Sequence, residues 1–150
     1  MPSFTKGGGT TTPFGNREYL RSTRGKKVES YTLAGATVPA KTIDGAAGQK
    51  ILQKGTVLAK ITSGPDAGKV GPRQAGATDG RQTLTNIVGL CDTFLPWQLI
   101  ERDVEVGATY ECVAVQGWCV ELAADGSEVV LPDATADAMR GTKGLDILFK

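Results

Sequence analysis

The chain has 150 residues, which is the size of one domain and enough to bury an apolar core without metal or disulfide support. Its formal net charge at pH 7 is +1, which excludes a chain that is strongly basic or strongly acidic throughout. Histidine is absent, and with it the commonest general base and the commonest metal ligand.

Residues 1–30 differ in charge from the rest of the chain. They hold six basic and two acidic side chains, a balance of +4, whereas residues 31–150 hold 11 basic and 14 acidic ones, a balance of −3. Residues 7–13, Gly-Gly-Gly-Thr-Thr-Thr-Pro, show no periodicity and have little to bury. We therefore predict an extended N-terminal arm over residues 1–30, mobile in the free protein, and a folded body over residues 31–150.

The arm carries isolated side chains that could hold a partner. The alternative is a plain disordered tail without a binding role. If the arm becomes ordered on a partner, we expect two sets of residues to make the contacts. The apolar anchors are Phe4, Phe14, Tyr19 and Leu20, and the residues expected to bind acidic patches are Arg17, Arg21 and Arg24.

Two paired stretches organise the first half of the body. Residues 28–33 alternate as one extended segment, and residues 38–43 are a candidate edge strand because Pro39 cannot donate to a ladder. Residues 50–62 show the period-2 pattern of a half-buried strand, and residues 78–92 combine a turn with a β-branched run. We expect these two stretches to form a long hairpin or meander around a polar loop at residues 63–77.

The second half continues the β pattern. Residues 101–107 lead into a strand with a bend at Gly107, and residues 110–115 are apolar on nearly both faces, as in a central strand. Asp125-Gly126 predicts a hairpin. A short helix is predicted at residues 134–140, and a final strand at residues 145–149. About eight to ten short strands at this spacing favour an all-β fold with one short helix, a small barrel or sandwich.

The sequence offers no convincing catalytic or metal site. Cys91, Cys112 and Cys119 lie in apolar runs and are expected to be buried free thiols, with a Cys112–Cys119 bridge as the alternative. The loop from Gly64 to Lys69 lacks the spacing and the hydroxyl of a phosphate-binding loop. No apolar run approaches the about 20 residues of a membrane span, and no signal-peptide core is present. We expect a soluble protein without enzymatic activity, cofactor or metal.

At the paired stretches the sequence resembles the head decoration (capsid cement) proteins of tailed phages, of the lambda type. The matching features are Gly55-Thr56-Val57-Leu58-Ala59 before a glycine-rich loop, and then Thr78-Asp79-Gly80 leading into Ile87-Val88-Gly89-Leu90. Met139-Arg140-Gly141 before a terminal apolar strand also fits. The resemblance covers about residues 50–150, and its order of features is more specific than any single motif. The chain is longer than the family pattern in its arm and at residues 95–107.

The resemblance implies a β-tulip-like or small-barrel body that forms homotrimers at three-fold and quasi-three-fold positions of an icosahedral shell. It also implies an arm that becomes ordered on the major capsid protein, a partner of the HK97-type fold. Such a protein is made in the host cytoplasm, binds the outer surface of the virion and stabilises the expanded, DNA-filled head. It needs no direct contact with nucleic acid or membrane.

Two other classes of function remain open at this point. The first is a nucleic-acid-binding β-barrel with a basic N-terminal tail, and the second is an enzyme or carbohydrate-binding barrel. Trp97 and Trp118 are interpreted as core or subunit-contact residues rather than as platforms for base stacking. For the trimer contact the candidates are Leu95, Pro96 and Trp97, since an apolar loop with proline and tryptophan is costly to leave in water.

Overall fold

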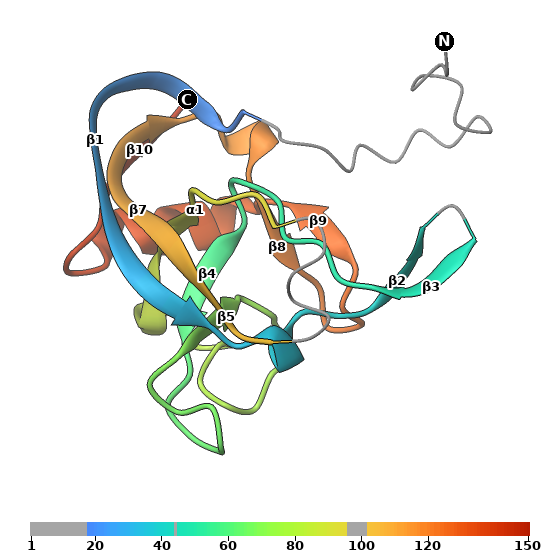
Figure 1. Cartoon of the computed structure of the whole chain (residues 1–150). Coiled ribbons are helices and arrows are strands. Elements are labelled where there is room, and N and C mark those ends of the chain that lie inside the picture. Colours follow the sequence, from blue (N-terminus) through green and yellow to red (C-terminus); the bar gives the residue numbers. More distant parts are fainter. Residues whose placement is uncertain (1–17, 44, 96–101) are drawn as a thin grey trace, which may run out of the picture.

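The computed structural model of the chain describes residues 18–43, 45–95 and 102–150 (Figure 1). Strands dominate this described part. They are β1 (Leu20–Leu33), β2 (Lys41–Ile43), β3 (Ala46–Gln49), β4 (Val57–Lys60), β5 (Val70–Pro72), β6 (Ile87–Cys91), β7 (Val104–Ala114), β8 (Val120–Leu122), β9 (Glu128–Val130) and β10 (Asp146–Phe149). The α-helix is α1 (Asp133–Gly141), and short 3-10 turns are η2 (Gly35–Thr37), η3 (Leu84–Asn86) and η5 (Gln116–Trp118). The predicted all-β fold with one short helix is confirmed.

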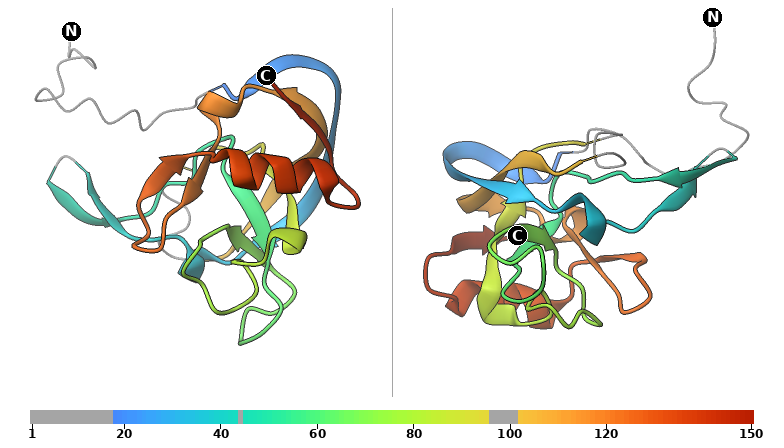
Figure 2. Two further views of the ribbon diagram at one scale, coloured as in Figure 1. Left: turned by 180° about the vertical axis from the view of Figure 1, so that it is seen from behind. Right: turned by 60° about the horizontal axis from the view of Figure 1, so that its bottom comes forward.

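The largest sheet closes in a ring. Its strands are hydrogen-bonded in the order β1-β5-β4-β6-β7-β10, and β7 also pairs with β1. The first five strands therefore close on themselves, and a closed sheet leaves few strand edges open to unwanted pairing. Seen from behind, α1 crosses in front of this ring, where it lies against β10 and η3 (Figure 2).

The long strand β7 is the centre of the ring. One of its sides pairs antiparallel with β1 along nearly its whole length, from Leu33 opposite Val104 to Leu20 opposite Ala114. The other side pairs first with β6 and then, in parallel, with β10. The predicted central strand at residues 110–115 is confirmed. Residues 101–107 do lead into this strand, but the strand begins earlier than predicted, at Val104, and runs without a break through Gly107 to Ala114.

The first strand begins earlier than the sequence pattern indicates. β1 starts at Leu20, and its ladder with β7 is irregular between Ser22 and Lys27, where Gly25 adopts a φ of 76°. The polar residues of this irregular part hide the period-2 signal of a strand. Residues 20–30 therefore belong to the sheet, and the predicted boundary between arm and body at residue 30 does not match where the sheet begins. Residues 1–17 lie outside the described part of the chain.

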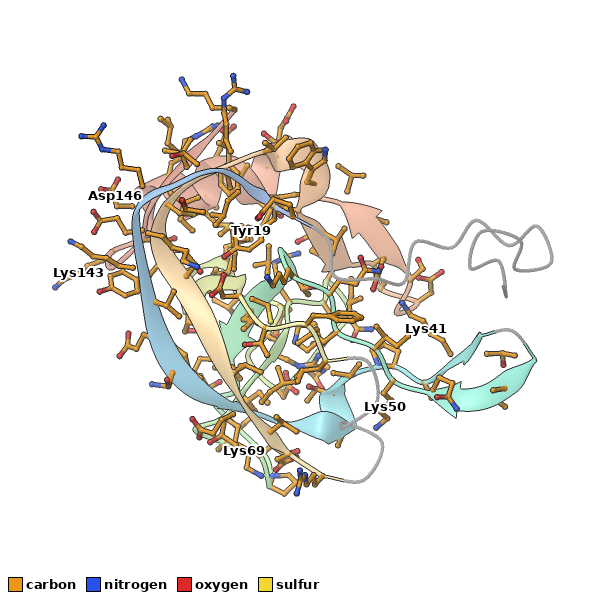
Figure 3. The ribbon with its side chains drawn as sticks, turned by 45° about the horizontal axis from the view of Figure 1, so that its top comes forward. Tyr19, Lys41, Lys50, Lys69, Lys143 and Asp146 are labelled. Carbon is orange, nitrogen blue, oxygen red and sulfur yellow. The ribbon has the colours of Figure 1, made fainter. Side chains whose placement is uncertain are left out.

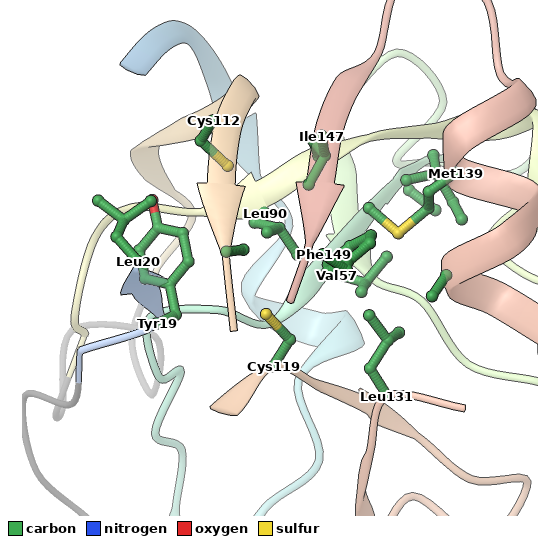
Figure 4. Packing of buried hydrophobic residues seen from close by; sticks show 14 residues of the cluster. Tyr19, Leu20, Val57, Leu90, Cys112, Cys119, Leu131, Met139, Ile147 and Phe149 are labelled. Carbon is green, nitrogen blue, oxygen red and sulfur yellow. The ribbon is translucent and has the colours of Figure 1, made fainter. Parts of the chain in front are cut away.

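Strand β4 separates two hydrophobic clusters. Val57 and Ala59 face a cluster that includes Tyr19, and Leu58 between them faces a second cluster that includes Leu95. Successive side chains of a strand point to opposite faces, so both faces of β4 are buried. Figure 4 shows the first cluster, to which α1 contributes Met139 and β10 contributes Ile147 and Phe149.

Other predicted elements are confirmed, with two additions. β4 pairs antiparallel with β6 as expected, and the hairpin β8–β9, α1 and β10 lie where the sequence places them. The expected loop at residues 63–77 contains β5, which pairs with both β4 and β1. Residues 46–49 form β3, which projects from the body in a hairpin with β2 (Figure 1).

Candidate interaction surface

The side chain of Tyr19 fixes the start of β1 to the ring. The phenol donates a 2.7 Å hydrogen bond to Asp92 Oδ1 and lies 2.7 Å from the hydroxyl of Thr109. Only 1% of the residue is exposed, and burial raises the pKa of the Tyr19 phenol above its usual range. Its backbone carbonyl accepts a hydrogen bond from Val115 N at 2.9 Å. Figure 3 shows Tyr19 among the strands, whereas Lys143 projects away from the body.

Gly55 provides the space that Tyr19 occupies. Gly55 has a φ of +83°, and a Cβ added there would lie 2.7 Å from Tyr19 Cβ and 3.1 Å from the carbonyl oxygen of Trp118. Both of these residues therefore lie against Gly55. The backbone agrees, since Val115 bonds to Tyr19 through its N–H and to the N–H of Trp118 through its carbonyl. The start of β1 and η5 are immediate neighbours.

The prediction that Tyr19 and Leu20 are arm residues without partners in the body is wrong. Tyr19 is 1% and Leu20 7% exposed, and both belong to the first hydrophobic cluster. Their side chains remove apolar area from water within the chain itself, so they are not free to anchor another protein. No local signal indicates this, because the partners of the Tyr19 side chain, Asp92 and Thr109, are more than 70 residues away in the chain.

The basic residues of the predicted arm have different environments. Arg21 and Arg24 are exposed on β1. Lys26 pairs with Asp92 at 3.2 Å and Lys27 with Glu111 at 3.0 Å, so these two charges are already compensated within the chain. The remaining predicted arm residues lie outside the described part, and they are Phe4, Phe14 and Arg17.

The predicted trimer contact is wrong for Leu95. This residue is 3% exposed, packs in the second hydrophobic cluster and pairs with Leu52 through two backbone hydrogen bonds of 2.9 Å. An apolar side chain that is already buried has no area left to offer a second copy. Pro96 and Trp97, the other two candidates, lie outside the described part of the chain.

The described residues do present a different exposed apolar surface. Trp118 in η5 is 46% exposed, and Val129 and Val130, on the two faces of β9, are 37% and 59% exposed. We call these three residues, which lie along η5 and the β9 edge, the Trp118 surface. Leu131 N donates to Cys119 O at 2.9 Å, which places the end of β9 beside η5. Within the described part, β9 has β8 as its one partner strand. Trp118 was predicted to be either a core or a subunit-contact residue. Its exposure shows that it is not a core residue, and the subunit contact stays a prediction.

No catalytic arrangement is apparent in the described residues. The three cysteines are buried and free, and burial raises the pKa of Cys91 to about 12, of Cys112 to about 11 and of Cys119 to about 12. Residues 18–43, 45–95 and 102–150 contain no cluster of three His, Cys, Asp or Glu side chains suited to a metal. Lys69, in the rejected phosphate-type loop, is bound by Asp66 at 2.9 Å and by Asp103 at 2.6 Å.

One open cavity lies where β1 leaves the regular ladder. It has a volume of about 270 Å³ and lies between β1 and β10. Its lining includes the cation Arg24, the carboxylates Glu111 and Asp146, and the half-exposed Leu148. Because Glu111 already binds Lys27, this mixed set does not converge on one ligand chemistry.

No protein-family model matches the chain, and neither a curated protein nor a solved structure is significantly similar to it. In the described part of the chain, no helix has the length and apolar character to cross a membrane.

Proposed function

We propose that the chain is a structural virion protein that decorates the outer surface of a tailed-phage capsid and stabilises the expanded, DNA-filled head. It binds as a homotrimer at three-fold and quasi-three-fold positions, with a major capsid protein of the HK97-type fold as its partner. It acts by binding alone, without catalysis or a cofactor. The family resemblance at residues 50–92 and 139–149 suggests this role, and the β-rich ring is compatible with it.

The burial of Tyr19 and Leu20 is the observation that carries the proposal. A glycine- and threonine-rich stretch of 17 residues is joined to the body at a side chain that bonds to Asp92 and Thr109. A bridge between shell subunits transmits load only if its attachment point does not yield. The Tyr19 anchor distributes such a load over β1, β7 and the segment after β6, and the closed ring resists deformation.

The energetics favour an assembled rather than a single binding unit. Ordering each arm residue costs about 1–2 kcal/mol of backbone entropy, so one arm is expected to bind weakly. Extended backbone has free donors and acceptors that can add a strand to an exposed edge of the shell protein. Three arms on one trimer make the later contacts intramolecular, which raises avidity by about 10²–10⁴.

The nucleic-acid alternative has less support. Phosphate binding needs basic side chains that are free to release counterions. Lys26 and Lys27 are held by Asp92 and Glu111. Among residues 18–30, which the structure describes, this leaves the exposed Arg21 and Arg24 as a small electropositive area. A steep loss of DNA binding with rising salt would favour this alternative instead.

The test uses expanded heads of the encoding phage assembled without this protein. We expect the full chain to bind them as a trimer and to raise the temperature at which the heads rupture. A chain of residues 18–150 should stay folded, because it keeps Tyr19 and the hydrogen bonds of its phenol. The same chain should lose binding, because it lacks the arm. Deletion to residue 30 is unsuitable, since it removes most of β1.

A full-length Phe4→Ser/Phe14→Ser variant is the second test. Unchanged binding by both variants would contradict the arm role, and no binding by the full chain would contradict the proposed function.

A further inference from the structure

We infer that the Trp118 surface is the part of the folded body that docks on the shell protein, beside the start of β1, to which residues 1–17 are joined. The surface consists of Trp118 in η5 and Val129 and Val130 in β9. It fits an apolar strand edge of the partner. The inference rests on the proposed function and adds a second, rigid contact to the one made by residues 1–17.

The attachment of the arm limits where its partner can lie. Tyr19 and the backbone of Trp118 flank Gly55, and Val115 bonds to both residues. Phe14 precedes Tyr19 by five residues, so it can lie at most about 18 Å from it even when the chain is fully extended. A shell protein that binds Phe14 is therefore held close to the Trp118 surface.

The chemistry of β9 also fits a strand edge. Successive side chains of a strand point to opposite faces, and both Val129 and Val130 are exposed, so β9 presents apolar groups on its two faces. A strand that is apolar on both faces is typical of one covered on both sides. Because β9 has β8 as its one partner strand in the described part, its other edge can receive a further strand.

The charges around this surface are compensated within the chain. Glu128, the first residue of β9, binds Lys41 at 3.1 Å and Gln53 at 3.2 Å. Asp133, just after β9, accepts a 2.7 Å hydrogen bond from Gln116. These carboxylates are engaged, which favours an apolar partner over a charged one. Tryptophan is also the residue type most often found at interface hot spots, and Trp118 is 46% exposed.

The test compares matched variants of the full chain on the decoration-free expanded heads. Trp118→Ser and Val130→Lys are expected to weaken binding at least about tenfold, as loss of a hot-spot contact does. The control is Val28→Lys, the same substitution at a valine that is 41% exposed on β1, where it lies opposite Thr109 of β7 and not in the β8–β9 hairpin. This control should bind like the wild type. Circular dichroism and the melting temperature establish that each variant is folded.

The outcomes separate the inference from the proposed function. If residues 18–150 lose binding but Trp118→Ser and Val130→Lys bind normally, the inference is overturned and the proposed function stands. A fall in the solution mass of Val130→Lys would assign the surface to a second copy of the chain and overturn the inference. A change in Trp118 emission on deleting residues 1–17 in a Trp97→Phe background would assign it to the chain's own arm, with the same consequence. No binding by the wild type would overturn both.

Discussion

The phenol of Tyr19 donates a 2.7 Å hydrogen bond to Asp92, which lies 73 residues later in the chain. The same carboxylate receives Lys26 Nζ at 3.2 Å, so Asp92 binds β1 at two points. One of these is its buried start and the other is its irregular middle. The segment after β6 thereby fixes the strand to which residues 1–17 are joined.

Tyr19→Phe is expected to lower the free energy of unfolding by about 1–2 kcal/mol. The phenyl ring keeps its packing, but the buried Thr109 hydroxyl and the Asp92 carboxylate lose a partner. Urea unfolding at pH 7 measures the loss. Tyr31→Phe is the matched control, because its hydroxyl donates to Glu29 at an exposed site, and its effect should be within about 0.5 kcal/mol. Equal losses in the two variants would contradict a special role for the Tyr19 anchor.

Gly55→Ala is expected to destabilise the protein by more than Gly64→Ala. Both glycines have a positive φ, +83° and +88°, so each alanine suffers a backbone strain of about 1–2 kcal/mol. A Cβ at Gly64 meets nothing within 4 Å, whereas one at Gly55 collides with Tyr19 Cβ at 2.7 Å. The difference between the two melting temperatures therefore reports the collision alone. If the two variants melt together, Tyr19 does not pack against Gly55.

The sequence predicted the elements whose signals are local. Asp125-Gly126 marks the hairpin β8–β9, and Pro132-Asp133 with Gly141 marks α1. These turns and caps depend on neighbouring residues, so they can be recognised without knowledge of the fold. The period-2 pattern at Val57–Lys60 likewise identified β4 and its pairing with β6.

The sequence missed the elements that depend on distant partners. The polar start of β1 is a strand because β7, about 90 residues later in the chain, pairs with it. Val70–Pro72 is only three residues long and contains Gly-Pro, yet it closes the ring between β1 and β4. Leu95 was expected at the surface because its apolar loop has no local partner, but Leu52 covers it. For the same reason, nothing local indicated that Trp118 would be exposed beside Tyr19.

Glu121→Gln is expected to lower the free energy of unfolding by about 3–5 kcal/mol, since it leaves a buried guanidinium without its counter-charge. Arg73 Nη1 lies 2.6 Å from Glu121 Oε2, and the two side chains are 10% and 6% exposed. Thr135 of α1 donates to the same carboxylate, so the pair links β5, β8 and the helix. Glu111→Gln, which breaks the solvated pair with Lys27, is the control and should have little effect. Chemical unfolding at pH 7 compares the two, and a loss no larger than that of the control would contradict the prediction.

Asp103 is expected to contribute to the acid sensitivity of the protein. Its hydrogen bond from Lys69 at 2.6 Å, and then that from Gly35 N at 2.8 Å, lower the pKa of Asp103 below its usual range. A lowered folded-state pKa means that the contribution is present above the unfolded pKa of about 3.9 and is lost as the pH falls through the folded value. Asp103→Asn should therefore melt below the wild type at pH 7 but not at about pH 2. Glu105→Gln is the control, because it removes a carboxylate charge whose partner is the neutral Thr32 hydroxyl and leaves an amide oxygen to accept that hydrogen bond. The melting temperature of this control relative to the wild type should change less with pH. A constant difference at all pH values would contradict the prediction.

The cysteines are expected to resist thiol reagents in the folded protein and to react as three free thiols once it unfolds. At pH 8 a thiol whose pKa is about 11 or 12 is ionised in roughly one molecule in a thousand or fewer, and the thiolate is the nucleophile. A coloured disulfide reagent, added without reductant, counts the reactive thiols in the folded protein and, after guanidinium is added, in the unfolded protein. Cys112 should be the first to react in the native state, because it lines the open cavity between β1 and β10, and Cys112→Ser should remove that slow phase. One titratable thiol in the unfolded chain, instead of three, would show that two of the three cysteines form a disulfide and would contradict the structure.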